Sequence, residues 1–459
     1  MMAAGVPEPT QAYWLSTLDS TTPDEWVRAI DSCRDDNGVV SLSINNATGL
    51  CYVIKRNFDG SLQWAKSLTS ASFTIDPFDV SVADTGEIYV CGNTGQATPK
   101  AWLVCFDSDG TLLFKKDLDD TLNANLVSGQ TRVKALSGGD VIFAYTIQNG
   151  AFLYRINIAR IEPDGTIDWQ TYIEGFGPQS AFDVNESDGE IVIIGHNYDD
   201  DPFRWVKLDI ADGDTTHFRE ASSPTFDGTF NIFDVCHNNS YYFAVGQFSQ
   251  NGWTSGVAVL RFSHDGVMGV AREFPNASSD SETSDLSQHG IAAGGLGIAI
   301  NNSDEIFLSW STNGVFIDGL TTDKASTHVI KMTEALNVDE QVRIIADDTF
   351  TDTAWHYARI RLDNEGGLLF GQFILDNNFS LVGRLPQDFT GQGSYSGLVD
   401  SDYEPWVYEA GIWPDKTNES TQSNSNGSGN TALTGVLTIA DSTIVVATPS
   451  IAVDIATIS

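Results

Sequence analysis

The residues best suited to chemistry are carboxylates that gather in short turns. Asp107 and Asp109 lie in the turn DSDG, and Asp209, Asp212 and Asp214 lie in DIADGD. Several oxygens on one turn suit Ca²⁺, which takes oxygen ligands. Neither turn has the twelve-residue spacing of an EF-hand loop, and an Asx turn, in which the Asp side chain accepts a backbone N–H, explains both without an ion. We therefore predict no metal site and no cofactor.

The nucleophiles and bases of the chain are scattered. No pair of histidines has the i, i+4 spacing of a helical metal motif, no C-x-x-C pair occurs, and neither a G-x-S-x-G elbow nor a phosphate-binding P-loop is present. We predict that the histidines are surface or turn residues, that the odd number of cysteines are reduced and buried, and that no residue is catalytic. The residues concerned are His196, His217, His237, His264, His289, His328 and His356, with Cys33, Cys51, Cys91, Cys105 and Cys236.

The charge balance limits the partners. Asp and Glu number 62 against 24 Lys and Arg, a net charge of -38. Nucleic acid needs clustered cations, so it is excluded as a partner, and the acidity predicts a solvated surface that repels other copies. We expect no signal peptide, because the first residues lack a basic region followed by an apolar one, and no membrane span, because no apolar run reaches 18 residues.

The elements that must position these side chains are short strands joined by tight turns. Alternating runs rich in Val, Ile, Tyr, Phe and Trp are separated by Gly, Asn and Asp clusters, as in β-hairpins. One family of seven turns begins at Asp35, Ala83, Leu136, Glu186, His237, Asn301 and Asn364. A second family turns at Asp59-Gly60, Asp109-Gly110, Asp164-Gly165, Asp212-Gly213 and Asp265-Gly266, with a degenerate member near Asn337-Val338. Four strands per repeat of about 50 residues predict the blades of a β-propeller.

The ends of the repeat suggest how the ring closes. The seventh unit has its inner hairpin and a third strand at FSLVGRL (379–385), but no Asp-Gly turn follows. The N-terminal segment AYWLSTL (12–18) matches the outermost strand of other units, such as QWAKSL. We predict that it completes the seventh blade, with Tyr13 and Trp14 beside the third strand, so that no sheet edge is left open there.

FDVSVADTGEIYVCGNT followed by AWLVCFDSDGTLLFKKDL resembles the propeller repeats of bacterial SBBP and quinoprotein-like families. The whole arrangement is similar to propeller proteins of tailed, notably marine, phages: an N-terminal strand, several such units, LVGRLPQDFTGQGSYS and a Thr/Ser-rich tail. The resemblance implies an all-β, seven-bladed β-propeller and a place in a virion, made in the host cytoplasm. It specifies the fold more sharply than the function.

The chain beyond the repeat divides by composition. We predict an N-terminal extension (1–11), the propeller (12–386), an aromatic and Gly-rich extension (387–416), a linker (417–430) and a C-terminal β-strand anchor (431–459). The anchor has no aromatic residue and no Lys or Arg, and two or three strands fit it. An isolated hairpin is marginally stable in water, so these strands need a partner sheet. They dock on another chain by strand addition, or they fold back on the propeller.

We therefore predict a non-enzymatic virion structural protein, a tail, fibre or surface-appendage component that assembles with other virion proteins and symmetry-related copies of itself and contacts a host-surface glycan. Capsid decoration stays open as an alternative role. A protein of another class, a bacterial glycan-binding lectin or glycoside hydrolase, stays open as well. A sialidase is not favoured, because Arg160-Ile161-Glu162-Pro163 only approximates the Arg-Ile-Pro segment of sialidases. The residues predicted to serve assembly are Tyr13, Trp14, Leu433, Val436, Leu437, Ile439, Ile444, Val445, Val446, Ile451, Val453 and Ile455.

Overall fold

The computed structural model describes a chain built of strands. It covers residues 14–19, 25–33, 38–45, 48–70, 74–94, 100–120, 125–148, 154–176, 180–196, 203–221, 230–250, 253–275, 296–312, 326–345, 358–363, 365–374, 379–388, 430–432, 437–441, 445–447 and 452–457. Among these residues, no helix has the length and apolar character needed to cross a membrane.

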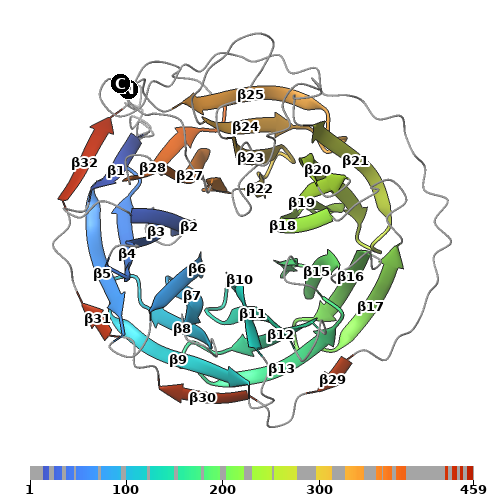
Figure 1. Ribbon diagram of the computed structural model, residues 1–459, viewed down its shortest axis with the longest axis horizontal. Helices are drawn as coiled ribbons and strands as arrows, with labels where there is room; N and C mark the ends of the chain where they lie inside the picture. The colour runs from blue at the N-terminus through green and yellow to red at the C-terminus, as the bar shows by residue number, and fades with distance from the viewer. Residues whose placement is uncertain are drawn as a thin grey trace, which may run out of the picture.

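Seven antiparallel sheets are arranged around a central axis, as Figure 1 shows, and the predicted all-β, seven-bladed propeller is confirmed. Blade 1 comprises β2 (Glu25–Cys33), β3 (Gly38–Asn45), β4 (Leu50–Asn57) and β5 (Leu62–Thr69). Blade 2 comprises β6 (Ile75–Val82), β7 (Ile88–Thr94), β8 (Ala101–Phe106) and β9 (Leu112–Asp120). Blade 3 comprises β10 (Asn125–Ala135), β11 (Val141–Gln148), β12 (Tyr154–Ile161) and β13 (Ile167–Glu174).

The remaining blades follow in chain order. Blade 4 comprises β14 (Ala181–Asn185), β15 (Glu190–His196), β16 (Phe203–Asp209) and β17 (Thr215–Ala221). Blade 5 comprises β18 (Phe230–His237), β19 (Tyr241–Gln250), β20 (Trp253–Ser263) and β21 (Met268–Pro275). Blade 6 comprises β22 (Gly297–Ile300), β23 (Ile306–Thr312), β24 (Ser326–Met332) and β25 (Val338–Ile345), and blade 7 contains β26 (Ala358–Leu362), β27 (Gly367–Ile374) and β28 (Phe379–Pro386).

The two ends of the chain add strands to the outer edges of blades. β1 (Trp14–Asp19) pairs with β28, with Trp14 opposite Arg384 and Leu18 opposite Ser380. Among the described residues from 430 onward there are four strands, where the sequence predicts two or three: β29 (Asn430–Ala432), β30 (Leu437–Asp441), β31 (Val445–Ala447) and β32 (Ala452–Thr457). They pair with β13, β9, β5 and β1 respectively, so they run round the rim of the same chain from blade 3 to blade 7 (Figure 1).

The core lies between the faces of neighbouring blades. One cluster joins side chains of blades 1 and 2, such as Leu42 and Trp102, and another joins blades 7 and 1 through Leu369 and Ile54. The middle strands of a blade are covered on both faces, which is why β3 and β7 are buried along their whole length. Nearly continuous apolar strands are expected where a sheet has no solvent face.

The Asp-Gly turn of each outer hairpin also serves the packing between blades. Gly110 has φ of 76°, which favours glycine, and a Cβ added there would lie 2.8 Å from the ring of Trp64 in the preceding blade. Trp64 in turn donates through Nε1 to the carbonyl of Ser108 at 2.9 Å. Trp169 repeats this arrangement, donating to Ile210 beside Gly213. In both cases, therefore, the Asp-Gly turn of one blade packs against the Trp side chain of the preceding blade.

Candidate functional site

The candidate site is the axial channel, a cavity of about 420 Å³. Residues of all seven innermost strands line it, from β2 through β26. Each of these strands pairs on only one side within its blade, so its other edge faces the axis. Backbone N–H groups on such an edge need acceptors from outside the sheet.

Aspartates on the innermost strands supply these acceptors. Asp31 accepts from the backbone N of Val82 at 2.9 Å, and Asp79 accepts from the backbone N of Val133 at 3.3 Å. Asp234 accepts from the backbone N of Ile298 at 3.2 Å. In each case the carboxylate belongs to one blade and the donor to the next. These aspartates therefore join successive blades around the axis.

Local irregularities aim the aspartates at the neighbouring strand. The pairing register shifts between Val27 and Ala29, between Pro77 and Asp79, and between Ile232 and Asp234. Each shift lies just before, or at, the channel aspartate of its strand. A β-bulge bends a strand and redirects its side chains, which is the device used here.

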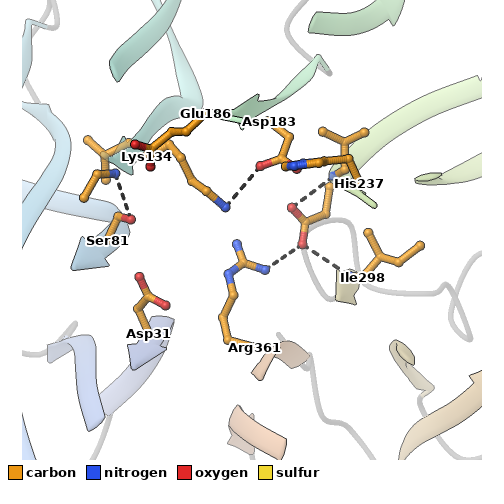
Figure 2. A network of polar contacts seen from close by, with 12 residues as sticks. Asp31, Ser81, Lys134, Asp183, Glu186, His237, Ile298 and Arg361 are labelled. Carbon is orange, nitrogen blue, oxygen red and sulfur yellow. Dashed lines mark hydrogen bonds and ion pairs between the residues drawn. The ribbon is translucent and has the colours of Figure 1, made fainter. Parts of the chain in front are cut away.

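Basic side chains complete the network. Lys134 Nζ lies 3.1 Å from Asp183 Oδ1, and His237 Nδ1 lies 2.6 Å from Asp183 Oδ2. The Arg361 guanidinium donates to Asp234 at 2.8 Å, which ties blade 7 to blade 5 across the channel. Figure 2 shows Lys134 and Arg361 extending into the same space, with Asp31 facing it from blade 1.

The network sets the protonation of its members. Burial alone would raise the pKa of Asp183, but Lys134 and His237 hold that pKa well below its usual range. The Asp183 carboxylate raises the pKa of Lys134. Burial raises the pKa of Asp31, although Arg361 and Lys134 oppose the shift. The channel thus keeps a firmly ionised Asp183 and a carboxyl at Asp31 that resists ionisation.

These groups can bind rather than react. Asp79, Asp183 and Asp234 already accept hydrogen bonds from the protein, and burial raises the pKa of the Cys236 thiol well above its ordinary value, so it is a poor nucleophile. Lys134 keeps 45% of its side chain exposed and has further donors to offer. The arrangement can hold a small polar group by hydrogen bonds. Among the described residues, the side chains that could hold a metal are Asp188, Glu190 and His264, away from this cluster.

The predicted acidic turns are Asx turns. Asp107 accepts from the backbone N of Asp109 and Thr111, and Asp209 accepts from the backbone N of Ala211. The five cysteines are free and buried, as predicted. His217 is exposed, as predicted, whereas His237 lies in the channel and contacts Asp183, because its strand ends at the axis.

Seven of the residues predicted for assembly lie in the described part of the chain, on strands apart from the channel. Trp14, Leu437, Ile439, Val445, Val446, Val453 and Ile455 belong to the added strands β1, β30, β31 and β32. Tyr13, Leu433, Val436, Ile444 and Ile451 lie outside the described residues, as do most of the aromatic extension and the linker.

Sequence reasoning missed the channel, although a signal for it exists. The triplet Phe-Asp-Val occurs at 78–80, 182–184 and 233–235, each time on an innermost strand. A charged residue repeated in the middle of a strand that is otherwise apolar indicates a shared structural task. Here that task is the contact between blades.

No protein-family model matches the sequence, and no curated protein sequence matches it. Solved structures share the fold at low identity. Hydrazine synthase of Kuenenia stuttgartiensis is similar over 82% of this chain and 98% of that chain, with a TM-score of 0.50 and 12% identity. An apocarotenoid oxygenase mutant of Synechocystis matches with a TM-score of 0.40 and 9% identity, covering 86% of this chain and 94% of that chain. The WD40 domain of SCAP from fission yeast matches with a TM-score of 0.36 and 8% identity, covering 81% and 98%. The similarity is that of β-propellers and extends to the fold alone.

Proposed function

We propose that this chain is a non-enzymatic structural protein of a phage virion, a component of the tail, a fibre or another surface appendage. The place in a virion rests on the resemblance of the repeat, the N-terminal strand and the Thr/Ser-rich tail. The channel supports a structural role, because its aspartates join blades instead of standing free for catalysis.

The observation that carries an assembly role is the state of the outer sheet edges. Blades 1, 2, 3 and 7 each carry an added C-terminal strand. In the part of the chain that the structure describes, β17, β21 and β25 carry none, so three consecutive blades present an outer backbone edge (Figure 1). Main-chain hydrogen bonds to such an edge are the basis of strand addition between proteins.

We assign these edges to the C-terminal strands of a symmetry-related copy. The same segment pairs with the equivalent edge of four blades in its own chain, so its backbone suits this position. Exchange of an element between copies is a low-cost route to dimers, and pairing with blades 4 to 6 of another copy requires tail strands to leave the rim of their own chain. A contact between copies would then repeat the geometry already present within one chain.

Ring closure belongs to the same proposal. β1 lies between β28 and β32, so the first strand of the chain lies in the sheet of its last blade. We propose that this pairing closes the ring and that β32 covers the outer edge of β1. Closure of this kind protects the seam between blades 7 and 1 from pairing with other chains.

Deletion of residues 431–459 tests the assembly role. The truncated protein should keep its far-UV circular dichroism but fail to join particles in a fixed copy number, because its docking strands are gone. Deletion of residues 1–11 removes no described strand and is the matched control. Incorporation of the truncated chain at the wild-type copy number would rule out the tail as the docking element.

A glycan-binding role is the second candidate, and the polar channel favours it. Lys134 and Arg361 offer donors, and Asp31 offers carboxyl oxygens, which suits the hydroxyl groups of a sugar. A glycan array separates the two roles. Glycan binding that is lost in the Lys134→Met variant would support a lectin. Particle incorporation with no glycan signal would support the structural role and not the lectin. Capsid decoration is distinguished from a tail position by labelling the protein in purified heads and tails.

A further inference from the structure

A second cluster of chemically capable side chains lies between blades 4 and 5, outside the aspartate network of the channel. It comprises Asp188 in the turn after β14, Glu190 at the start of β15, and His264 in the turn between β20 and β21. Their ligand atoms all lie within 4.8 Å of one another. Carboxylate oxygens and an imidazole nitrogen together form a ligand set typical of Zn²⁺ and its neighbours in the first transition row.

The hydrogen bonds of His264 fix its tautomer. Nε2 lies 3.1 Å from the backbone carbonyl oxygen of Asn238, and a carbonyl only accepts, so Nε2 carries the proton. Nδ1 lies 3.2 Å from Asp188 Oδ2, which also accepts from Asn185 Nδ2 at 2.9 Å. A nitrogen and an oxygen this far apart suit neighbouring ligands of one tetrahedral Zn²⁺ ion. Histidines that bind metals commonly donate their other N–H to a backbone carbonyl in this way.

The second carboxylate has an oxygen to spare. Glu190 Oε1 lies 2.7 Å from Lys207 Nζ, which fixes the side chain. Glu190 Oε2 is buried and has no hydrogen-bond partner among the described residues. A buried carboxylate oxygen without a partner is costly, and a bound cation would remove that cost.

Tyr242 packs beside the cluster. Its side chain is 0% exposed, and its ring centroid lies 4.9 Å from that of His264. The aromatic ring limits the access of water to His264, as the apolar surroundings of metal sites commonly do.

We propose that Asp188, Glu190 and His264 bind a divalent first-row transition metal, with Zn²⁺ as its representative, and that the ion fastens blade 4 to blade 5. The three side chains leave at least one coordination position to water or to a further ligand. Because the ligands come from two blades, metal binding stabilises the folded ring over the unfolded chain.

Zn²⁺ binding to the full-length, metal-stripped protein tests the proposal. Isothermal titration with Zn²⁺ should give one site per chain, and Co²⁺ should give visible absorption bands of a low-symmetry N/O site. His264→Gln and Glu190→Gln should each weaken Zn²⁺ binding at least about tenfold. His217→Gln is the matched control. It changes an exposed histidine of blade 4, the blade that carries Asp188 and Glu190, and the variant should bind Zn²⁺ as tightly as the wild type.

A folding control keeps the result interpretable. The unfolding midpoint of the wild type should rise when Zn²⁺ replaces EDTA, while the midpoint of Glu190→Gln, although it loses the ion pair with Lys207, should be the same in Zn²⁺ as in EDTA. Ca²⁺ at equal concentration should leave Zn²⁺ bound. The proposal is overturned if the wild type binds no Zn²⁺, if the His264 and Glu190 variants bind it as tightly as the wild type, or if Ca²⁺ displaces it.

Discussion

A buried ion pair within blade 7 positions an arginine that packs on blade 1, and its removal is a sharp test of the fold. Arg384 Nε lies 2.6 Å from Asp363 Oδ2, and both side chains are 0% exposed. Asp363 Oδ1 also accepts from the backbone N of Glu365 at 2.9 Å and of Gly367 at 2.7 Å. The Arg384 guanidinium lies 4.4 Å from the centre of the Phe58 ring in blade 1. One carboxylate therefore organises a turn of blade 7 and the cation that packs on blade 1.

Asp363→Ala should lower the free energy of unfolding by about 3–5 kcal/mol, because it leaves a buried guanidinium without its closest anion. Unfolding entropy of about 2.1 cal/mol/K per residue gives about 1 kcal/mol/K for 459 residues. A loss of about 4 kcal/mol thus corresponds to a fall of about 4 °C in the unfolding midpoint. Glu365→Ala is the matched control: its carboxylate lies 3.8 Å from Arg384 and is 40% exposed, so the cost should stay below about 1 kcal/mol.

Urea unfolding followed by tryptophan fluorescence measures these differences. Asp363→Ala, Arg384→Met and the double variant form a cycle, and the double variant should cost less than the sum of the singles, because it leaves no buried charge unpaired. The reasoning is refuted if Asp363→Ala costs no more than Glu365→Ala, or if the two single costs simply add.

Two further perturbations follow from the contacts between blades. Gly110→Ala should destabilise the protein by about 1–3 kcal/mol, because it combines a positive φ with a Cβ that meets Trp64. Gly138→Ala is the control, since a Cβ added at Gly138 meets nothing within 4 Å. Equal stabilities of the two variants in thermal unfolding would contradict the packing described. The pKa of Asp183 is lower folded than unfolded, so its ionised form stabilises the ring above the unfolded pKa of about 3.9, and this contribution falls away as the pH drops towards the folded pKa. Between about pH 4 and about pH 2, the unfolding free energy of the wild type should therefore decline more steeply than that of Asp183→Asn, and parallel declines in that window would exclude the stabilising charge.

The sequence predicts the turns well because their chemistry is local. The glycines of all five Asp-Gly turns have positive φ, since two adjacent residues determine whether such a turn forms. The degenerate sixth turn is less accurate. Its positive φ of 59° belongs to Leu336, one residue before the expected Asn337, and no glycine marks the position.

The channel could not be predicted in the same way because its contacts are remote. Asp31 and Val82 are 51 residues apart, and Asp234 and Arg361 are 127 apart. Only the arrangement of seven blades around one axis brings such pairs together. The repeated Phe-Asp-Val triplet predicts that a carboxylate recurs on the innermost strand, but not which backbone N–H it meets. His264 shows the same limit, since its partners Asp188 and Glu190 come from another blade.

The chain covers strand edges both at the axis and at the rim of the molecule. At the axis, Asp31, Asp79 and Asp234 cap the inner edge of the following blade. At the rim, the tail strands cap the outer edges of blades 3, 2, 1 and 7. An outer strand edge that carries no added strand still has backbone N–H and C=O groups that can form hydrogen bonds with another chain. A partner is therefore expected to bind where the added strands end. The outer edges of β17, β21 and β25 meet that condition, so contacts between copies should concentrate on blades 4 to 6, and cross-linking from the tail of one copy should reach those blades of another.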